Sequence, residues 1–205
     1  MQLHGDHRIC FVGDSFVQGT CDPEYRGWVG RVASAARTLG YNLTAYNLGV
    51  RMHTSRDVQK RWEAECSVRF RPGCSAYVVF SFGANDMTLE AGRPRVDEDE
   101  SVANFAAIVG AAQKKYEVAV VGPCPVGDAD QDERILRLCS SYESQSRALR
   151  VPYLPIARSL VGNALWLSEV KANDGSHPGA TGYELIASTV VGWQSWWFRR
   201  NAAQR

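Results

Sequence analysis

A serine, a histidine and an aspartate in this chain of 205 residues could together carry out nucleophilic catalysis. Ser15 follows the apolar run Ile9–Val12 and stands where a buried strand would turn into a helix. A serine hydroxyl attacks poorly unless a base accepts its proton. His177 is the best base, because a turn through Gly175 can bring the Asp174 carboxylate to its Nδ1 and leave Nε2 free for the nucleophile.

Acyl transfer also needs hydrogen-bond donors at the point where the negative oxygen develops. We expect three at strand ends: the backbone N–H of Ser15, the backbone N–H of Gly49 and the side-chain amide of Asn85. Taken alone, Ser15 could be only a helix cap, and Asn85 could only stabilise its turn. The combination favours catalysis, whereas Asp14 and Asp86 are interpreted as turn-stabilising carboxylates.

Two further side chains could contact substrate. Arg51 and His53 follow the second expected strand and would suit an anionic or polar group, with a solvated loop as the equal alternative. The six cysteines form no CxxC pair, so we expect no metal, no disulfide framework and no organic cofactor. Four loops are candidates for setting specificity, and their shortness favours a shallow pocket: residues 51–55, 87–95, 125–132 and 162–173.

The elements that must position these residues alternate between strand and helix. Apolar runs predict five strands, at residues 9–12, 43–48, 76–82, 118–121 and 151–156. Helical periodicity lies between them, at residues 28–39, from Ser55 to before Pro72, from Asp99 or Ser101 to about 112, and at 130–149. This order predicts an α/β fold, a parallel sheet with helices on both faces. Ligands of such sheets bind at the carboxyl ends of the strands, where the candidate residues lie.

The two ends of the chain carry separate expectations. Residues 1–7 are interpreted as a polar N-terminal tail on a single domain that spans 1–205. The last helix should start near Pro178 or Ala180 and run to about Phe198. Its aromatic cluster, Trp193, Trp196, Trp197 and Phe198, is expected to pack onto the sheet, with a homodimer contact as the alternative.

Composition excludes several classes of partner. The formal net charge of +1 argues against a nucleic-acid partner or an anionic membrane surface. No apolar run reaches the length of a membrane span, and the first ten residues lack the apolar stretch of a signal peptide. We therefore expect a cytoplasmic protein whose partner is a small molecule.

Four short blocks in order resemble the SGNH hydrolase superfamily, the GDSL-like lipases and acylhydrolases. They are Gly13-Asp14-Ser15-Phe16, Asn47-Leu48-Gly49, Gly83-Ala84-Asn85-Asp86 and Asp174-Gly175-Ser176-His177. The resemblance implies a flavodoxin-like three-layer α/β/α sandwich with about five parallel strands. It also implies that Ser15 is the nucleophile, His177 the base and then the acid, and Asp174 its orienting group. Ser15, Gly49 and Asn85 would form the oxyanion hole.

The chain departs from the family pattern at two places. Phe16 replaces the usual leucine, which is a conservative apolar change. After Gly49 the family often has Ser-Gly-Asp-Thr, where this chain has Arg51-Met52-His53-Thr54. The second departure alters the rim beside the oxyanion hole and leaves substrate preference open.

The sequence thus predicts a serine esterase that cleaves a small or short-chain carboxylic ester through an acyl-enzyme intermediate. A thioesterase or an acyltransferase with the same triad is one alternative. Another is a non-catalytic flavodoxin-like module that binds phosphate at the helix N-terminus after Gly13. That second alternative leaves Asp174, His177 and Asn85 without a task.

Overall fold

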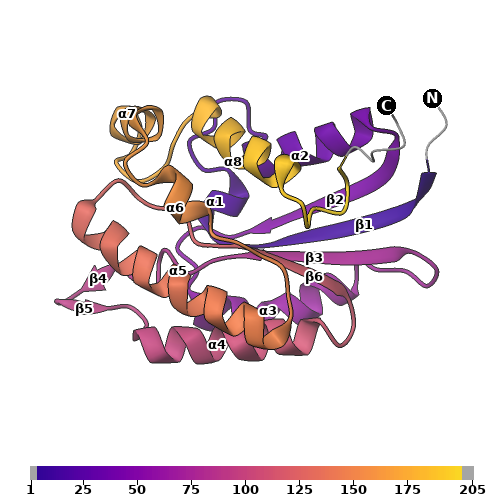
Figure 1. Ribbon diagram of the computed structural model, residues 1–205, viewed down its shortest axis with the longest axis horizontal. Coiled ribbons are helices and arrows are strands. Elements are labelled where there is room, and N and C mark those ends of the chain that lie inside the picture. Colours follow the sequence, from indigo (N-terminus) through magenta and orange to yellow (C-terminus); the bar gives the residue numbers. More distant parts are fainter. Residues whose placement is uncertain (1–3, 200–205) are drawn as a thin grey trace.

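The computed structural model describes residues 4–199, which form a five-stranded parallel sheet between two layers of helices (Figure 1). The strands are β1 (His4–Gly13), β2 (Tyr41–Gly49), β3 (Ser75–Ser81), β6 (Glu117–Val121) and β7 (Tyr153–Leu154). Their order, β2-β1-β3-β6-β7, is that of flavodoxin-like folds. The expected fold class is confirmed. From β1 the chain first adds β2 on one side and then adds β3, β6 and β7 on the other. Folds of this kind bind their ligands at this switch point, between β1 and β3.

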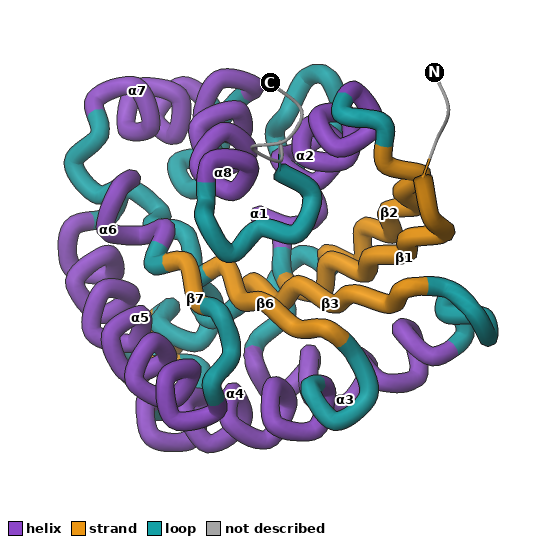
Figure 2. Tube along the Cα trace, turned by 45° about the vertical axis from the view of Figure 1, so that its right-hand side comes forward, coloured by secondary structure: helices purple, strands orange, loops and turns teal. Residues whose placement is uncertain are grey.

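Helices cover both faces of the sheet, as Figures 1 and 2 show. On one face α2 (Gly27–Thr38) packs against α8 (Ala180–Gly192), and on the other α4 (Glu98–Ala112) packs between α3 (Ser55–Ser67) and α5 (Ala129–Leu149). Shorter elements complete the chain: α1 (Ser15–Gln18), α6 (Ile156–Leu160), α7 (Ala164–Ala172) and the antiparallel pair β4 (Leu89–Glu90) and β5 (Arg93–Pro94). The apolar run of β1 is wholly buried between the layers, which explains why it reads as continuous rather than alternating.

The N-terminal boundary differs from the expected one. Residues 4–7 belong to β1 rather than to a tail, and residues 1–3 of that expected tail lie outside the described residues. Strand β1 pairs with β2 from His4 onward, through an irregularity before His7. The His7 ring lies among three aromatic rings, those of Tyr41, Tyr77 and Phe198, so aromatic packing holds this end of the strand.

The C-terminal boundary also differs, because the last helix ends at Gly192 rather than near Phe198. Trp193 adopts an extended conformation, and the chain then folds back over the sheet. This turn buries Trp196 and Phe198 almost completely. The expectation that the aromatic cluster packs onto the sheet is therefore confirmed for these two side chains, although not as part of a helix.

One predicted loop is a helix. Within residues 162–173, where sequence analysis placed a specificity loop, Asn163 caps α7 by accepting hydrogen bonds from the N–H groups of Leu165 and Trp166. The Trp166 indole is buried and stacks on Phe16, next to Ser15. The segment therefore contributes a wall behind Ser15 rather than a free loop.

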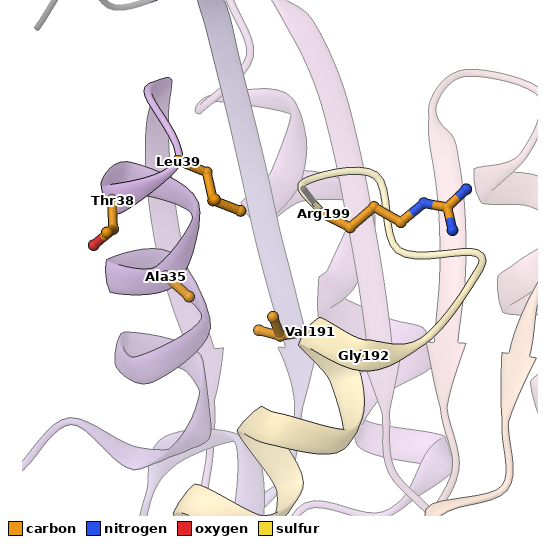
Figure 3. Close-up of a pocket in the computed structure, with 6 residues that line it drawn as sticks. All are labelled: Ala35, Thr38, Leu39, Val191, Gly192 and Arg199. Carbon is orange, nitrogen blue, oxygen red and sulfur yellow. The ribbon is translucent and has the colours of Figure 1, made fainter. Parts of the chain in front are cut away.

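A cavity of ≈ 540 Å³ lies away from the carboxyl ends of the strands. It is lined by the C-terminal ends of α2 and α8 together with Arg199 (Figure 3). Thr38 and Leu39 on its wall lead into β2, which places it at the amino end of that strand. Among residues 4–199, no helix combines the length and the apolar character that a membrane crossing requires.

Candidate active site

Ser15 is the first residue of α1, directly beyond the end of β1. Asp14, not Ser15, caps this helix: its carboxylate accepts a hydrogen bond from the Phe16 N–H at 3.0 Å. The Ser15 side chain is therefore free of the capping role that was its main alternative. Its Oγ lies 2.7 Å from His177 Nε2, across 162 positions of sequence.

His177 also contacts Asp174, so Ser15, His177 and Asp174 form a hydrogen-bonded relay. His177 Nδ1 lies 2.8 Å from Asp174 Oδ2, while Asp174 Oδ1 accepts the backbone N–H groups of Ser176 and His177 at 3.0 and 2.9 Å. Burial opposes ionisation of Asp174, but the hydrogen bonds from His177 and Ser176 outweigh it and lower the carboxyl pKa to about 2. The carboxylate is thus charged; it holds the imidazole by one contact and the backbone of the same loop by two.

The imidazole itself is kept neutral. Burial lowers the pKa of His177, Asp174 opposes this effect, and the cation of Arg51 adds to it. A histidine with a lowered pKa is unprotonated at neutral pH and can accept a proton at Nε2. The relay therefore has the protonation state that activation of Ser15 requires.

Glu169 on α7 anchors the loop that carries His177. Its carboxylate accepts the backbone N–H groups of Gly179, Thr181 and Gly182 at 2.9, 3.2 and 2.7 Å, at the start of α8. Gly179 is the N-cap residue of α8 and has no side chain to do this. Sequence analysis missed Glu169, because it lies ten residues before the helix that it caps and no local pattern links the two.

Asn85 comes to the same edge of the sheet from the loop after β3. Its Nδ2 donates to the backbone carbonyl of His53 at 2.9 Å, and the second amide hydrogen remains available. The next residue, Asp86, is fully buried and accepts hydrogen bonds from the Ser55 N–H at 2.8 Å and the Ser101 hydroxyl at 2.5 Å. Asp86 is thus structural, as expected, but it ties its loop to α3 and α4.

Gly49 does not have the geometry expected of an oxyanion donor. Its N–H donates to Asn47 Oδ1 at 3.0 Å, and it does not line the cavity in front of Ser15. A Cβ at this position would lie 2.1 Å from the Gln18 backbone nitrogen. We conclude that glycine is needed here because α1 packs directly onto the end of β2.

Of the two residues predicted to contact substrate, Arg51 lines the cavity and His53 does not. His53 turns away from the cavity: its Nδ1 accepts the Arg61 Nε–H at 3.0 Å, and only its backbone carbonyl serves the site, by holding Asn85. Burial lowers the pKa of His53, and the Arg61 cation adds to this. Arg51 lines the cavity beside Ser15 and has no hydrogen-bond or ion-pair partner within residues 4–199.

Met52, unlike Gly49, lines the same cavity as Ser15. Its φ of +66° is a left-handed conformation that favours glycine. Its backbone N–H has no acceptor in the described part of the chain, and neither has that of Ser15. The one signal in the sequence was that Met52 stands where the family often has the glycine of Ser-Gly-Asp-Thr.

The cavity in front of Ser15 is small, ≈ 170 Å³. Side chains from five segments of the chain surround it. Its lining also includes Phe16 and Ser176, from two of the family blocks, and Thr88, Val126 and Gln131, from two of the segments expected to set specificity. These residues come from α1, from loops and from the start of α5, so their convergence depends on the tertiary fold.

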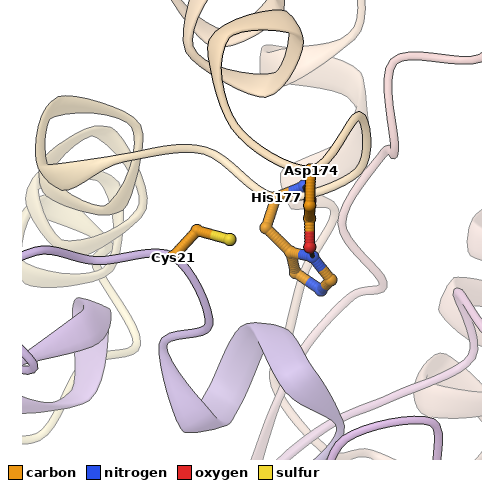
Figure 4. A group of neighbouring side chains, drawn as sticks. All are labelled: Cys21, Asp174 and His177. Carbon is orange, nitrogen blue, oxygen red and sulfur yellow. Dashed lines mark hydrogen bonds and ion pairs between the residues drawn. The ribbon is translucent and has the colours of Figure 1, made fainter.

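Cys21 lies beside the relay (Figure 4). Its Sγ and ligand atoms of Asp174 and His177 lie within 4.8 Å of one another, the one such grouping of three potential metal ligands among residues 4–199. An ion here would have to replace the hydrogen bond between Asp174 and His177. Burial raises the pKa of the Cys21 thiol, and the Asp174 carboxylate adds to this, so the group is a neutral thiol and a poor metal ligand.

The match to known proteins agrees with this arrangement. The model of the GDSL-like Lipase/Acylhydrolase family matches residues 11–185, and the chain belongs to this family. It is thus an ester hydrolase of the serine type, and the expected resemblance is confirmed. No curated protein matches the sequence.

Solved structures share the fold at low sequence identity. An acetylxylan esterase from Geobacillus stearothermophilus has a TM-score of 0.78 at 15% identity, covering 98% of this chain and 100% of its own. A lipase/acylhydrolase from Enterococcus faecalis has a TM-score of 0.74 at 21% identity, over 90% and 93%. LAE5, an alpha/beta hydrolase enzyme from the metagenome of Lake Arreo, has 0.70 at 17%, over 93% and 95%. The first of these was solved as catalytic mutants in which a histidine, a serine or an aspartate is replaced by alanine.

Proposed function

We propose that this chain hydrolyses short-chain carboxylic esters through an acyl-enzyme intermediate formed on Ser15. The observation that carries the proposal is the continuous relay from Ser15 Oγ through His177 to Asp174, with contacts of 2.7 and 2.8 Å. The named catalytic mutants of the acetylxylan esterase replace the same three residue types. A phosphate-binding module would have no use for this relay.

The reaction has two matched halves. Ser15 Oγ attacks the ester carbonyl carbon while its proton moves to His177 Nε2, and the proton then passes to the leaving alcohol as the C–O bond breaks. Water attacks the acyl-enzyme in the same way: His177 takes its proton and returns it to Ser15 as the acid leaves. Asp174 stabilises the imidazolium that forms in each half.

Three donors would hold the negative oxygen of each tetrahedral intermediate. They are the free amide hydrogen of Asn85 and the unpartnered backbone N–H groups of Ser15 and Met52. Met52 replaces Gly49 in this set, because the Gly49 N–H already has an acceptor. The left-handed backbone at Met52 supports this assignment, since strained backbone persists mainly where function uses it.

The size of the cavity supports a short acyl group. A volume of ≈ 170 Å³ is below the range of about 300–1,000 Å³ of pockets that enclose a drug-sized ligand. A long acyl chain would have to extend over the surface, whereas an acetyl group would fit. The acetylxylan esterase, whose name specifies an acetyl ester, supports the same acyl class.

The direct test is hydrolysis of 4-nitrophenyl acetate and butyrate by the wild type and Ser15→Ala. We expect the variant to fall to near the uncatalysed rate and to lose labelling by a fluorophosphonate probe, because the attacking oxygen is absent. Ser67→Ala, at the exposed end of α3, is the matched control and should retain both. Full activity in Ser15→Ala would refute the proposal.

A further inference from the structure

A second hollow adjoins the catalytic cavity on the side of α1. It is an open groove of ≈ 380 Å³, larger than the cavity at Ser15. Its lining includes the segment from Gln18 to Pro23, the ring of Tyr25 and the side of Arg51. Arg51 lines both hollows, and Cys21, on the wall of the groove, is the neighbour of Asp174 and His177. The groove and the cavity are therefore neighbours that share the Arg51 side chain as a wall.

The groove begins one short helix away from the nucleophile. Ser15 is the first residue of α1, and Gly19, on the wall of the groove, is the residue that ends this helix. At about 1.5 Å of rise per residue, the two are separated by roughly 6 Å along the helix axis. The groove is therefore within reach of the alcohol part of an ester whose acyl group fills the cavity.

The loop that carries Tyr25 is rigid. The Asp22 carboxylate is buried and accepts the backbone N–H groups of Glu24, Arg26 and Gly27 at 3.1, 3.2 and 2.7 Å. It also pairs with the buried guanidinium of Arg31 at 2.5 Å. Three backbone hydrogen bonds and one ion pair to the buried Asp22 carboxylate leave this loop little freedom, so the position of Tyr25 is determined by the fold.

Tyr25 has an exposure and a backbone conformation that are both unfavourable for an aromatic residue. Its side chain is 91% exposed, and its φ is +55°, in the left-handed region that bulky residues rarely adopt. Neither feature contributes to the core. A rigid, exposed aromatic ring beside a groove is a surface on which a ligand ring can stack at low entropic cost.

The polar groups around the ring favour a sugar over an alkyl chain. Gln18 is exposed, and its amide oxygen already accepts the Thr20 hydroxyl at 2.8 Å, which leaves the amide N–H groups free to donate. The Arg51 guanidinium is exposed and has no partner in the described residues. Donors at the sides and an aromatic face suit a ring that has hydroxyls at its edge and C–H groups on its face.

We propose that this groove, lined by Gln18, Tyr25 and Arg51, binds the alcohol part of the substrate and that this alcohol is a sugar. Tyr25 stacks on the sugar ring, and Arg51 and Gln18 donate hydrogen bonds to its hydroxyls. The inference rests on the proposed function, because it takes Ser15 as the point where the acyl group is transferred.

The test compares three acetate esters: methyl acetate, hexyl acetate and a mono-acetylated methyl xylopyranoside. The readout is the ratio of kcat/KM for the sugar ester to that for methyl acetate, whose alcohol is too small to reach Tyr25. We expect Tyr25→Ala to lower this ratio about tenfold, since loss of a stacked aromatic contact costs on that order. Tyr25→Phe keeps the ring and should restore most of the ratio.

The control is Val68→Ala, which alters a 78% exposed apolar side chain at the end of α3 and should leave the ratio unchanged. An unchanged ratio in a folded Tyr25→Ala would overturn the proposal. The proposal would also be overturned if the wild type preferred hexyl acetate to the sugar ester and Tyr25→Ala lost that preference. If no acetate were hydrolysed at all, the proposed function itself would fail, which is a distinct result.

Discussion

The charge state of a single ring, that of His177, sets the pH range in which the proposed nucleophile works. Because burial and Arg51 both lower the pKa of His177, the base is neutral down to a pH below the ordinary histidine value of about 6.5. Activity should therefore persist as pH falls and be lost only when His177 gains a proton.

We predict that Arg51→Met moves the acidic limb of the profile of kcat/KM against pH toward higher pH. The reason is that a cation which disfavours protonated His177 is removed. Rates are measured on methyl acetate. The readout is the pH at the midpoint of the acidic limb, not the maximal value of kcat/KM. Arg37→Met, an exposed change on α2, is the control, and an unmoved limb in Arg51→Met would contradict the prediction.

Asn85→Ala should lower kcat on the order of a hundred- to a thousandfold, with a much smaller change in KM. The amide hydrogen left free by the contact to His53 is available to a developing negative charge, and alanine cannot supply it. Steady-state kinetics on 4-nitrophenyl acetate provide the measurement, with the exposed Asn42→Ala on β2 as control. A variant that changes KM alone would identify Asn85 as a binding residue instead.

Sequence analysis located the side-chain groups of this site better than its backbone groups. Ser15, Asp174, His177 and Asn85 were identified because their chemistry belongs to the residue type and their blocks are spaced characteristically. The contact of the Gly49 N–H with Asn47 Oδ1 was not foreseen, because the direction of a backbone N–H depends on dihedral angles that the sequence does not display. The structure places Met52 at the cavity instead.

At the scale of elements, α7 and α8 act together to place His177. The Glu169 carboxylate replaces a local cap at the start of α8 and closes the loop between the two helices. The expected loop at 162–173 is a helix because Asn163 caps it and Trp166 has a buried site beside Phe16. The half-exposed Leu165 and Leu167 on either side of Trp166 obscure the helical periodicity of this short segment.

Glu169→Ala should lower the free energy of unfolding by about 1–2 kcal/mol, the usual cost of a lost helix cap. It should also reduce kcat, because the loop that carries His177 loses its anchor while Ser15 is untouched. Thermal unfolding and steady-state kinetics on the same preparations measure both effects. Glu133→Ala, on the exposed face of α5, should change neither, and a stable Glu169→Ala with full kcat would refute this role.

At the scale of the whole molecule, stability depends on a carboxyl group that the fold buries completely. Burial raises the pKa of Asp14 to about 7, far above its value of about 3.9 in an unfolded chain. Between these two pKa values the folded state holds a proton that the unfolded state has released. This group therefore makes the protein less stable as pH rises from about 4 to 7.

Asp14→Asn removes that dependence, because its amide cannot lose a proton in this range. The melting temperature of the variant relative to the wild type should therefore increase from pH 5 to pH 8, measured by circular dichroism. Asp130→Asn, at an exposed position on α5, should show a constant difference. If the difference for Asp14→Asn were also constant, burial of this carboxyl would have no linkage to folding.

The sheet was predictable from sequence, whereas the outer boundaries of the domain were not. Apolar strands separated by helical stretches allow few topologies, so the parallel order followed from general rules. The aromatic residues from Trp193 to Phe198 have a spacing that suits a helix, but burying Trp196 and Phe198 required the chain to turn back. That turn also buries, within the chain, two of the four aromatic side chains for which a homodimer contact was the alternative.

The 162-residue separation between the nucleophile and its base has a consequence for synthesis of the protein. Ser15, just beyond a central strand, leaves the ribosome well before His177, and the proposed base reaches it only when α7 and α8 have docked. With the proposed mechanism, the chain is inert toward esters until α7 and α8 complete the last layer. Onset of ester hydrolysis would report the moment at which this fold closes.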